Sequence, residues 1–164
     1  IAYTAGPFPL AYVGLGDVFV IAFFGLAATC GTYYLETGSV SPSSIFVGFA
    51  IGALATAILV VNNLRDRITD ARVGKRTLAV RFGARFTRAE YVTLLVSAYL
   101  CIVAAVTLNH LSGWMLLVLL TIPLAVSEVR GVLNKTGTDL NVHLGGTARL
   151  ELAFGVCLVV GALL

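Results

Sequence analysis

Three polar side chains spaced four residues apart are the first candidates for chemistry in this sequence. Asn62, Asp66 and Asp70 follow one another at that spacing, so in a helix they share one face, about one turn apart. Two carboxylates placed so closely repel each other. A cation between them, either a divalent metal or a neighbouring arginine, would relieve that repulsion.

Such an acidic face suits magnesium in particular. Mg²⁺ binds few carboxylates and completes its shell with water and phosphate oxygens, so Asp66 and Asp70 predict a seat for a metal-bound diphosphate. Arg72 and Lys75 follow closely and are expected to hold the same diphosphate. Asn62 or Asn63 is expected to orient it, because amides at the end of an apolar run need partners. The alternative is that the acids form only surface ion pairs with nearby arginines.

The composition indicates what surrounds this polar stretch. Hydrophobic residues make up 59% of the 164 residues, charged residues only 12%, and the mean hydropathy is +0.96. These values exclude an ordinary soluble domain and predict a membrane protein. The net charge of +3 is explained by membrane topology, described below, so we expect no nucleic-acid partner. An apolar cavity beside the acidic face would suit the tail of a lipid-linked diphosphate.

Apolar runs near the length of a membrane span, roughly 20 residues, divide the chain, and each holds at most one charged residue. The runs cover residues 18–35, 43–61, 89–108, 114–129 and 150–164. We predict an all-α, multi-pass transmembrane helical bundle with five spanning helices. Gly48 and Gly52 are predicted to allow close helix packing, and Asp17 is predicted to cap the first helix.

The basic residues give the bundle an orientation. All of the lysines and arginines fall after the second run or after the fourth, and these two segments lie on one side if the helices alternate. They are Arg65, Arg67, Arg72, Lys75, Arg76, Arg81, Arg85, Arg88, Arg130, Lys135 and Arg149. By the positive-inside rule that side is cytoplasmic. The face of Asp66 and Asp70 is therefore expected to open toward the cytoplasm, from an integral membrane protein of the inner membrane or its equivalent.

The remaining reactive residues predict little chemistry. Cys30, Cys101 and Cys157 lie within apolar runs and are interpreted as small buried hydrophobes. His110 falls on the opposite side of the membrane, and His143 falls in residues 130–148, which are interpreted as a polar connection, so neither is expected to act as a general base. The chain opens on Ile1 rather than Met, and we expect it to begin in the middle of a longer protein.

The polar stretch also carries a family resemblance. Residues 62–66 with Asp70, followed by residues 74–83, resemble the second aspartate motif and downstream loop of the UbiA superfamily of intramembrane prenyltransferases. More narrowly they resemble its MenA branch, which prenylates 1,4-dihydroxy-2-naphthoate. Residues 3–7 with 15–19, and residues 147–150, give supporting matches. The similarity runs over nearly the whole length.

This resemblance implies a nine-helix bundle in which residues 1–164 are the C-terminal part of one prenyltransferase domain, helices five to nine. A first aspartate motif would precede this chain, so these residues alone are expected to hold half a metal site and to be inactive. The implied reaction is an electrophilic aromatic substitution. A prenyl diphosphate ionises with help from Mg²⁺ and basic residues, and the aromatic acceptor attacks the allylic cation with loss of carbon dioxide.

The resemblance also implies roles for individual residues. Asp66 and Asp70 are expected to be the catalytic metal ligands, with Arg72, Lys75 and, as a further candidate, Arg81 on the diphosphate. The aromatic acceptor is expected to border Tyr3 and Arg149. The sequence leaves three alternatives open: another acceptor of the 4-hydroxybenzoate or homogentisate type, a transport bundle, or a structural membrane subunit.

Overall fold

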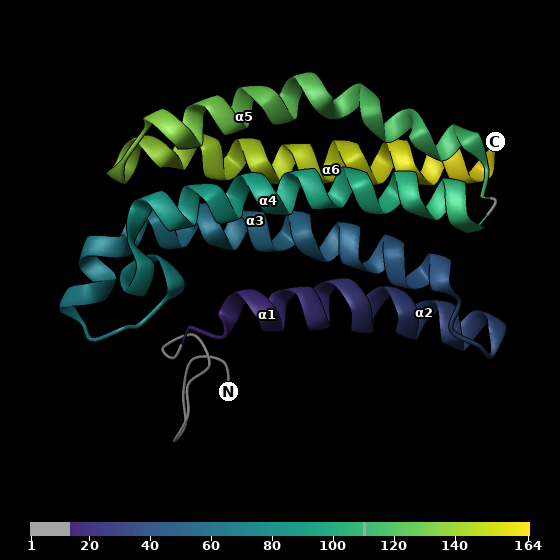
Figure 1. Cartoon of the computed structure of the whole chain (residues 1–164), viewed down its shortest axis with the longest axis horizontal. Helices are drawn as coiled ribbons and strands as arrows, with labels where there is room; N and C mark the ends of the chain where they lie inside the picture. Colours follow the sequence, from purple (N-terminus) through teal and green to yellow (C-terminus); the bar gives the residue numbers. More distant parts are fainter. Residues whose placement is uncertain (1–13, 110) are drawn as a thin grey trace.

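The computed structural model describes residues 14–109 and 111–164, and there the chain is built from helices (Figure 1). The first span joins α1 (Gly16–Val20), a π-helical segment (Ile21–Ala27) and α2 (Ala28–Thr37). Two long helices follow, α3 (Pro42–Arg72) and α4 (Leu78–Asn109). The last two spans each begin with a 3₁₀ segment, Gly113–Thr121 before α5 (Ile122–Asn134) and Gly137–Leu140 before α6 (Asn141–Leu163).

Five of these helical segments are long and apolar enough to cross a membrane within the described residues. They are Gly16–Thr37, Pro42–Arg72, Leu78–Asn109, Gly113–Asn134 and Gly137–Leu163. The predicted all-α membrane bundle with five spans is confirmed, and the chain is an integral membrane protein. The prediction that it forms the C-terminal part of a larger domain stays a prediction.

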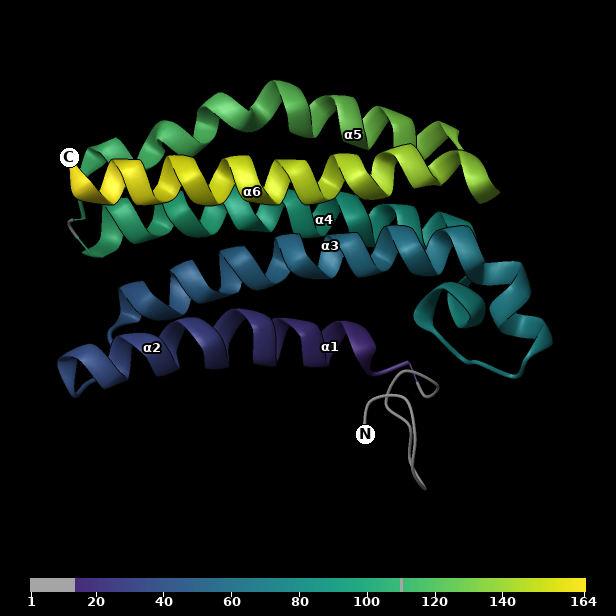
Figure 2. The ribbon, with the colours of Figure 1, turned by 180° about the vertical axis from the view of Figure 1, so that it is seen from behind.

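The spans lie side by side and alternate in direction. Both views show α3 next to α4 and the first span packed along the other side of α3 (Figures 1 and 2). The last two spans pack against each other, and α6 also packs against α3 while α5 also packs against α4. The α3–α4 connection, the end of α5 and the start of α6 lie at one end of the bundle. We call this the basic end, because residues 65–88 and 130–149 hold every lysine and arginine.

Helices continue through stretches that the sequence analysis interpreted as connections. α3 extends to Arg72 and α6 begins at Asn141, so the interpretation of residues 130–148 as a long connection is wrong. His143 therefore lies on a helix and not in a loop. The physical reason is that an apolar run marks the part of a helix within lipid, whereas backbone hydrogen bonding carries the helix beyond it.

Three glycines let the first span approach α3 closely. A Cβ atom on Gly25 would lie 2.5 Å from the carbonyl oxygen of Gly48 and 2.6 Å from the Cα of Gly52. The predicted packing role of Gly48 and Gly52 is thus confirmed, with Gly25 as the partner that the sequence did not identify. Small residues at such crossings are typical of helix pairs in lipid, where packing contributes much of the association energy.

The start of the first span differs from the prediction. Leu15, not Asp17, is the residue before the helix, and no side-chain hydrogen bond caps it. Asp17 is buried at 5% exposure, and its Oδ1 atom has no hydrogen-bond partner in the described structure. The expected capping role is therefore wrong, because Asp17 falls inside the first turn instead of preceding it.

Candidate functional site

The acidic face forms where α3 emerges at the basic end. The helix continues without interruption through residues 62–72, so Asn62, Asp66 and Asp70 lie along one side of it as their spacing predicts. Asp70 is buried, with 12% of its side chain exposed, whereas the Asp66 side chain is 33% exposed. The two acids therefore border the surface at different depths.

Arg65 donates hydrogen bonds to two of the three side chains on this face. Its guanidinium grips Asp66 in a fork: Nε donates to Oδ1 at 2.7 Å and Nη2 to Oδ2 at 2.6 Å. Nη2 also donates to Asn62 Oδ1 at 2.7 Å, and Nη1 donates to Asn141 Oδ1 at 2.9 Å. A bidentate arginine–carboxylate pair fixes geometry as well as charge. Pairing of the acids with nearby arginines was the alternative that the sequence left open, and Arg65, which directly precedes Asp66, makes such a pair.

Lys75 reaches Asp70 because of the way α3 ends. Gly74 adopts a positive φ of 76°, and the backbone N–H of Lys75 donates to the Asp70 carbonyl at 3.0 Å while that of Gly74 donates to Ala71 at 3.3 Å. This pair of bonds is a Schellman turn. It folds the chain back over the last helical turn, so that Lys75 Nζ donates to Asp70 Oδ2 at 3.1 Å.

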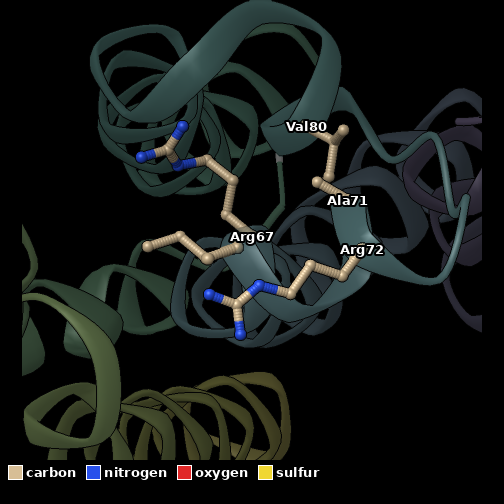
Figure 3. Close-up of a pocket in the computed structure, with 5 residues that line it drawn as sticks. Arg67, Ala71, Arg72 and Val80 are labelled. Atoms are coloured by element: carbon tan, nitrogen blue, oxygen red, sulfur yellow. The ribbon is translucent and has the colours of Figure 1, made fainter.

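Arg72 lies on a different part of the surface. It follows Asp70 by two residues, which turns it about 200° around the helix axis, and it borders a hollow together with Arg67, Ile68, Ala71 and Val80. Figure 3 shows the Arg67 and Arg72 side chains extending from α3 at this hollow, with their guanidinium groups apart from each other. The structure does not pair Arg72 with either acid.

The other predicted site residues are spread over the basic end. Asn63 is buried at 5% exposure, one position around the helix from the amide that holds Arg65. Arg81 is exposed on α4, where a Cβ on Gly14 would lie 3.6 Å from its Nε. Arg149 is exposed on α6 and donates to the Gly145 carbonyl at 3.4 Å. Tyr3 lies outside the described residues.

The acidic face has the donor chemistry of a partial magnesium site. Within the described residues, no three His, Cys, Asp or Glu side chains lie close enough together to hold a metal ion. Two carboxylates nevertheless fit Mg²⁺, which takes one or two from a protein and completes its shell with water and phosphate oxygens. A carboxylate has about four lone-pair sites, so Asp66 keeps acceptor positions beyond the two that Arg65 uses.

Comparison with known proteins places these residues in a family context. Residues 1–142 match the UbiA prenyltransferase family. A 1,4-dihydroxy-2-naphthoate octaprenyltransferase of Haemophilus influenzae is 38% identical over 100% of this chain and 54% of its own length. Its namesake in Escherichia coli is 40% identical over 82% of the chain and 44% of its own length.

A human protein is also similar. UbiA prenyltransferase domain-containing protein 1 of Homo sapiens is 33% identical over 99% of this chain and 46% of its own length. The chain thus spans about half the length of the curated relatives that it matches.

Proposed function

Because the chain belongs to the UbiA prenyltransferase family, we propose that the protein containing it transfers a polyprenyl group from an allylic prenyl diphosphate to 1,4-dihydroxy-2-naphthoate, in menaquinone or phylloquinone biosynthesis. The bacterial relatives that carry the name of this activity support the choice of acceptor. The observation that carries the proposal is the acidic face of α3, where Asp66 and Asp70 lie beside Arg65 and Lys75.

Asp66 and Asp70 would hold Mg²⁺ together with the diphosphate, and Asn62 or Asn63 would orient the site as an amide. When bound, the metal neutralises charge that develops on the departing diphosphate and so lowers the barrier to ionisation. Of the two amides, Asn62 is the better placed, because its Oδ1 already accepts from the arginine that grips Asp66. Asn63 points into the buried part of the bundle.

Lys75 is the best placed residue for the diphosphate itself. Its ammonium lies 3.1 Å from Asp70, so a phosphate oxygen near that acid would come within its reach. Cations fixed at the position where negative charge develops contribute strongly to catalysis. Arg72 and Arg81 remain proposed partners of the diphosphate. Because both lie on other faces of the basic end, they would contact phosphate oxygens far from the metal and not those beside it.

The aromatic acceptor is proposed to border Tyr3 and Arg149. A guanidinium is the natural partner for the carboxylate that this acceptor carries, and Arg149 is exposed on α6, two turns past the residue that contacts Arg65. The apolar spans would exclude water around the prenyl tail and so protect an allylic cation from hydrolysis. The ring then attacks that cation and loses carbon dioxide.

We propose that the site opens to the cytoplasm. All eleven lysines and arginines fall in residues 65–88 and 130–149 at the basic end, whereas residues 38–41 at the other end hold none. The positive-inside rule assigns such an end to the cytoplasm. An active site there would receive both a soluble aromatic acid and a diphosphate whose head group lies at that membrane surface.

The assignment is tested by replacing each acid with its amide in the full-length protein. Asp66→Asn and Asp70→Asn should each lower kcat for Mg²⁺-dependent prenyl transfer by at least about a hundredfold, because each removes a charge that the departing diphosphate relies on. Asp139→Asn makes the same change at an exposed position of the same end and should leave transfer unchanged. Undiminished activity and Mg²⁺ dependence in both site variants would refute the assignment.

A further inference from the structure

A buried hydrogen-bonded pair of side chains joins α5 and α6 near the basic end. Glu128 of α5 is only 7% exposed, and its Oε2 lies 2.8 Å from Nδ1 of His143 on α6. Buried carboxylates need such partners, above all in lipid, where they are costly and face the interior of the bundle. The pair uses neither of the acids at the site described above and has no role in the proposed reaction.

Two glycines make this pair possible, one on each helix. A Cβ on Gly131 of α5 would lie 1.9 Å from the His143 ring, and a Cβ on Gly146 of α6 would lie 2.3 Å from the Glu128 carboxylate. Each of these two side chains therefore lies against a glycine of the opposite helix, three residues beyond its partner. This reciprocal arrangement fixes both the register and the separation of α5 and α6.

Hydrogen bonds connect the same turn of α6 to α4. Thr147 donates to the His143 carbonyl at 2.7 Å, and its hydroxyl lies 2.9 Å from that of Tyr91 on α4. Both Tyr91 and Thr147 are fully buried. The first turns of α6 are thus held on two sides, by Glu128 from α5 and by Tyr91 from α4.

The first residue of α6 extends this network to the acidic face. Asn141 accepts a hydrogen bond from Arg65 Nη1 at 2.9 Å, while the other nitrogens of that guanidinium hold Asp66 and Asn62. Asn141 is itself exposed, so it contributes no buried packing. Its distinctive contact is with the arginine that orients Asp66.

We propose that Glu128 and His143 are positioning residues, which place the start of α6 so that Asn141 holds Arg65 and Arg65 holds Asp66. This inference rests on the proposed role of Asp66 as a metal ligand. Partners that hydrogen-bond to a ligating carboxylate orient it, and losing one typically costs tenfold to a hundredfold in metal affinity or activity. The pair thus acts on the site through three contacts and touches no substrate.

Asn141 gives the cleanest test, because its replacement disturbs no buried group. In the full-length protein, Mn²⁺ binding is measured by electron paramagnetic resonance in the presence of farnesyl S-thiodiphosphate, an analogue that does not react. Asn141→Ala should weaken Mn²⁺ binding by about tenfold, whereas Asn141→Asp keeps the acceptor oxygen and should bind like the unaltered protein. Asn134→Ala, at an exposed asparagine that bonds only to the Arg130 carbonyl among the described contacts, is the matched control.

The Glu128 variants test the connection to the buried pair. Glu128→Leu should weaken Mn²⁺ binding about as much as Asn141→Ala does. Glu128→Gln should retain most of the binding of the unaltered protein. The double variant of Glu128→Leu with Asn141→Ala should bind Mn²⁺ no more weakly than either single variant. Where Glu128→Leu lowers the folded yield, Glu128→Gln and the Asn141 variants decide. If the factors by which the two single variants weaken Mn²⁺ binding multiply in the double variant, a shared path through Asn141 is contradicted.

Other outcomes separate this inference from the proposed function. Unchanged or tighter Mn²⁺ binding in Asn141→Ala would overturn the inference, because Arg65 would then be dispensable to Asp66 or a competitor of the metal. Asp66→Asn is measured alongside. If that variant also binds Mn²⁺ normally, the proposed role of Asp66 fails; if it loses binding while Asn141→Ala does not, only the positioning role fails.

Discussion

Replacing Gly74 by alanine should disturb the site through backbone conformation alone. Gly74 has φ of 76°, in the left-handed region that L-residues avoid, and nothing lies within 4 Å of where its Cβ would be. Gly74→Ala therefore adds no clash. The substitution raises only the free energy of the turn that folds Lys75 back onto Asp70.

The size of the effect follows from that geometry. A residue other than glycine in the left-handed region costs about 1–2 kcal/mol, which corresponds to a factor of about 5 to 30 in the equilibrium between the closed and the opened turn. An opened turn withdraws Lys75 from Asp70, where its Nζ now lies at 3.1 Å. We expect the KM for the prenyl diphosphate to rise by up to that factor, because the apparent affinity falls with the fraction of closed turn.

Gly38 provides a matched control in the same chain. It ends α2 with φ of 72°, and nothing lies within 4 Å of its Cβ position either, but it lies at the end of the bundle opposite the basic end. Gly38→Ala and Gly74→Ala should therefore lower thermal stability by similar amounts. Steady-state kinetics of the full-length protein should show a raised KM for Gly74→Ala only.

Two results would refute this reasoning. If Gly74→Ala lowers stability as Gly38→Ala does but leaves the KM unchanged, the turn at Lys75 has no part in holding the diphosphate. If both variants raise the KM equally, the effect comes from a general loss of stability and not from the position of Lys75.

Three further predictions concern packing, topology and the core. Gly25→Ala should cost about 1–3 kcal/mol of stability through overpacking, because its Cβ would lie 2.5 Å from the α3 backbone. Gly31→Ala is the control, because its Cβ would meet nothing within 4 Å and should cost little. Thermal unfolding in detergent compares the two variants, and equal melting temperatures would contradict the close crossing. Arg76→Cys should react with a membrane-impermeant thiol reagent only from the cytoplasmic side, and Ser39→Cys only from the opposite side. Labelling of each cysteine from the reverse side would overturn the proposed orientation. Tyr91→Phe removes a buried hydrogen bond of 2.9 Å and should cost about 0.6 kcal/mol, with an unchanged melting temperature as the contrary result.

Much of the fold could be predicted because lipid leaves so few choices. Every apolar run became a spanning helix, since a chain in the hydrocarbon layer must satisfy its backbone groups internally. The helix ends could not be predicted in the same way. α6 begins at Asn141 and not near Leu150, because backbone hydrogen bonds extend it beyond the apolar run.

The candidate site was predicted in part. The spacing of Asp66 and Asp70 placed them on one face, and their mutual repulsion predicted a cation. The structure supplies two, Arg65 and Lys75. Lys75 was predicted to hold the diphosphate, and that role stays a prediction. Its contact with Asp70 depends on the left-handed turn at Gly74, and Arg65 also contacts Asn141, which lies 76 positions away. The spacing of residues along the chain predicts which of them share a helix face, but it does not predict contacts between distant segments.

The buried pair of Glu128 and His143 shows the same limit. A glutamate at the end of an apolar run and a histidine in a polar stretch carry no local signal. Only the crossing of α5 and α6, with a glycine on each helix opposite the polar side chain of the other, brings the two together.

A change of metal preference tests the central claim, that Asp66 and Asp70 bind the metal which holds the diphosphate. Thiolate ligands favour soft metals over Mg²⁺, so Asp70→Cys in the full-length protein should lose prenyl transfer with Mg²⁺ and regain part of it when Cd²⁺ is supplied. Asp139→Cys should keep the original Mg²⁺ dependence and gain nothing from Cd²⁺. Full Mg²⁺-dependent transfer by Asp70→Cys, with no change in metal preference, would contradict the account.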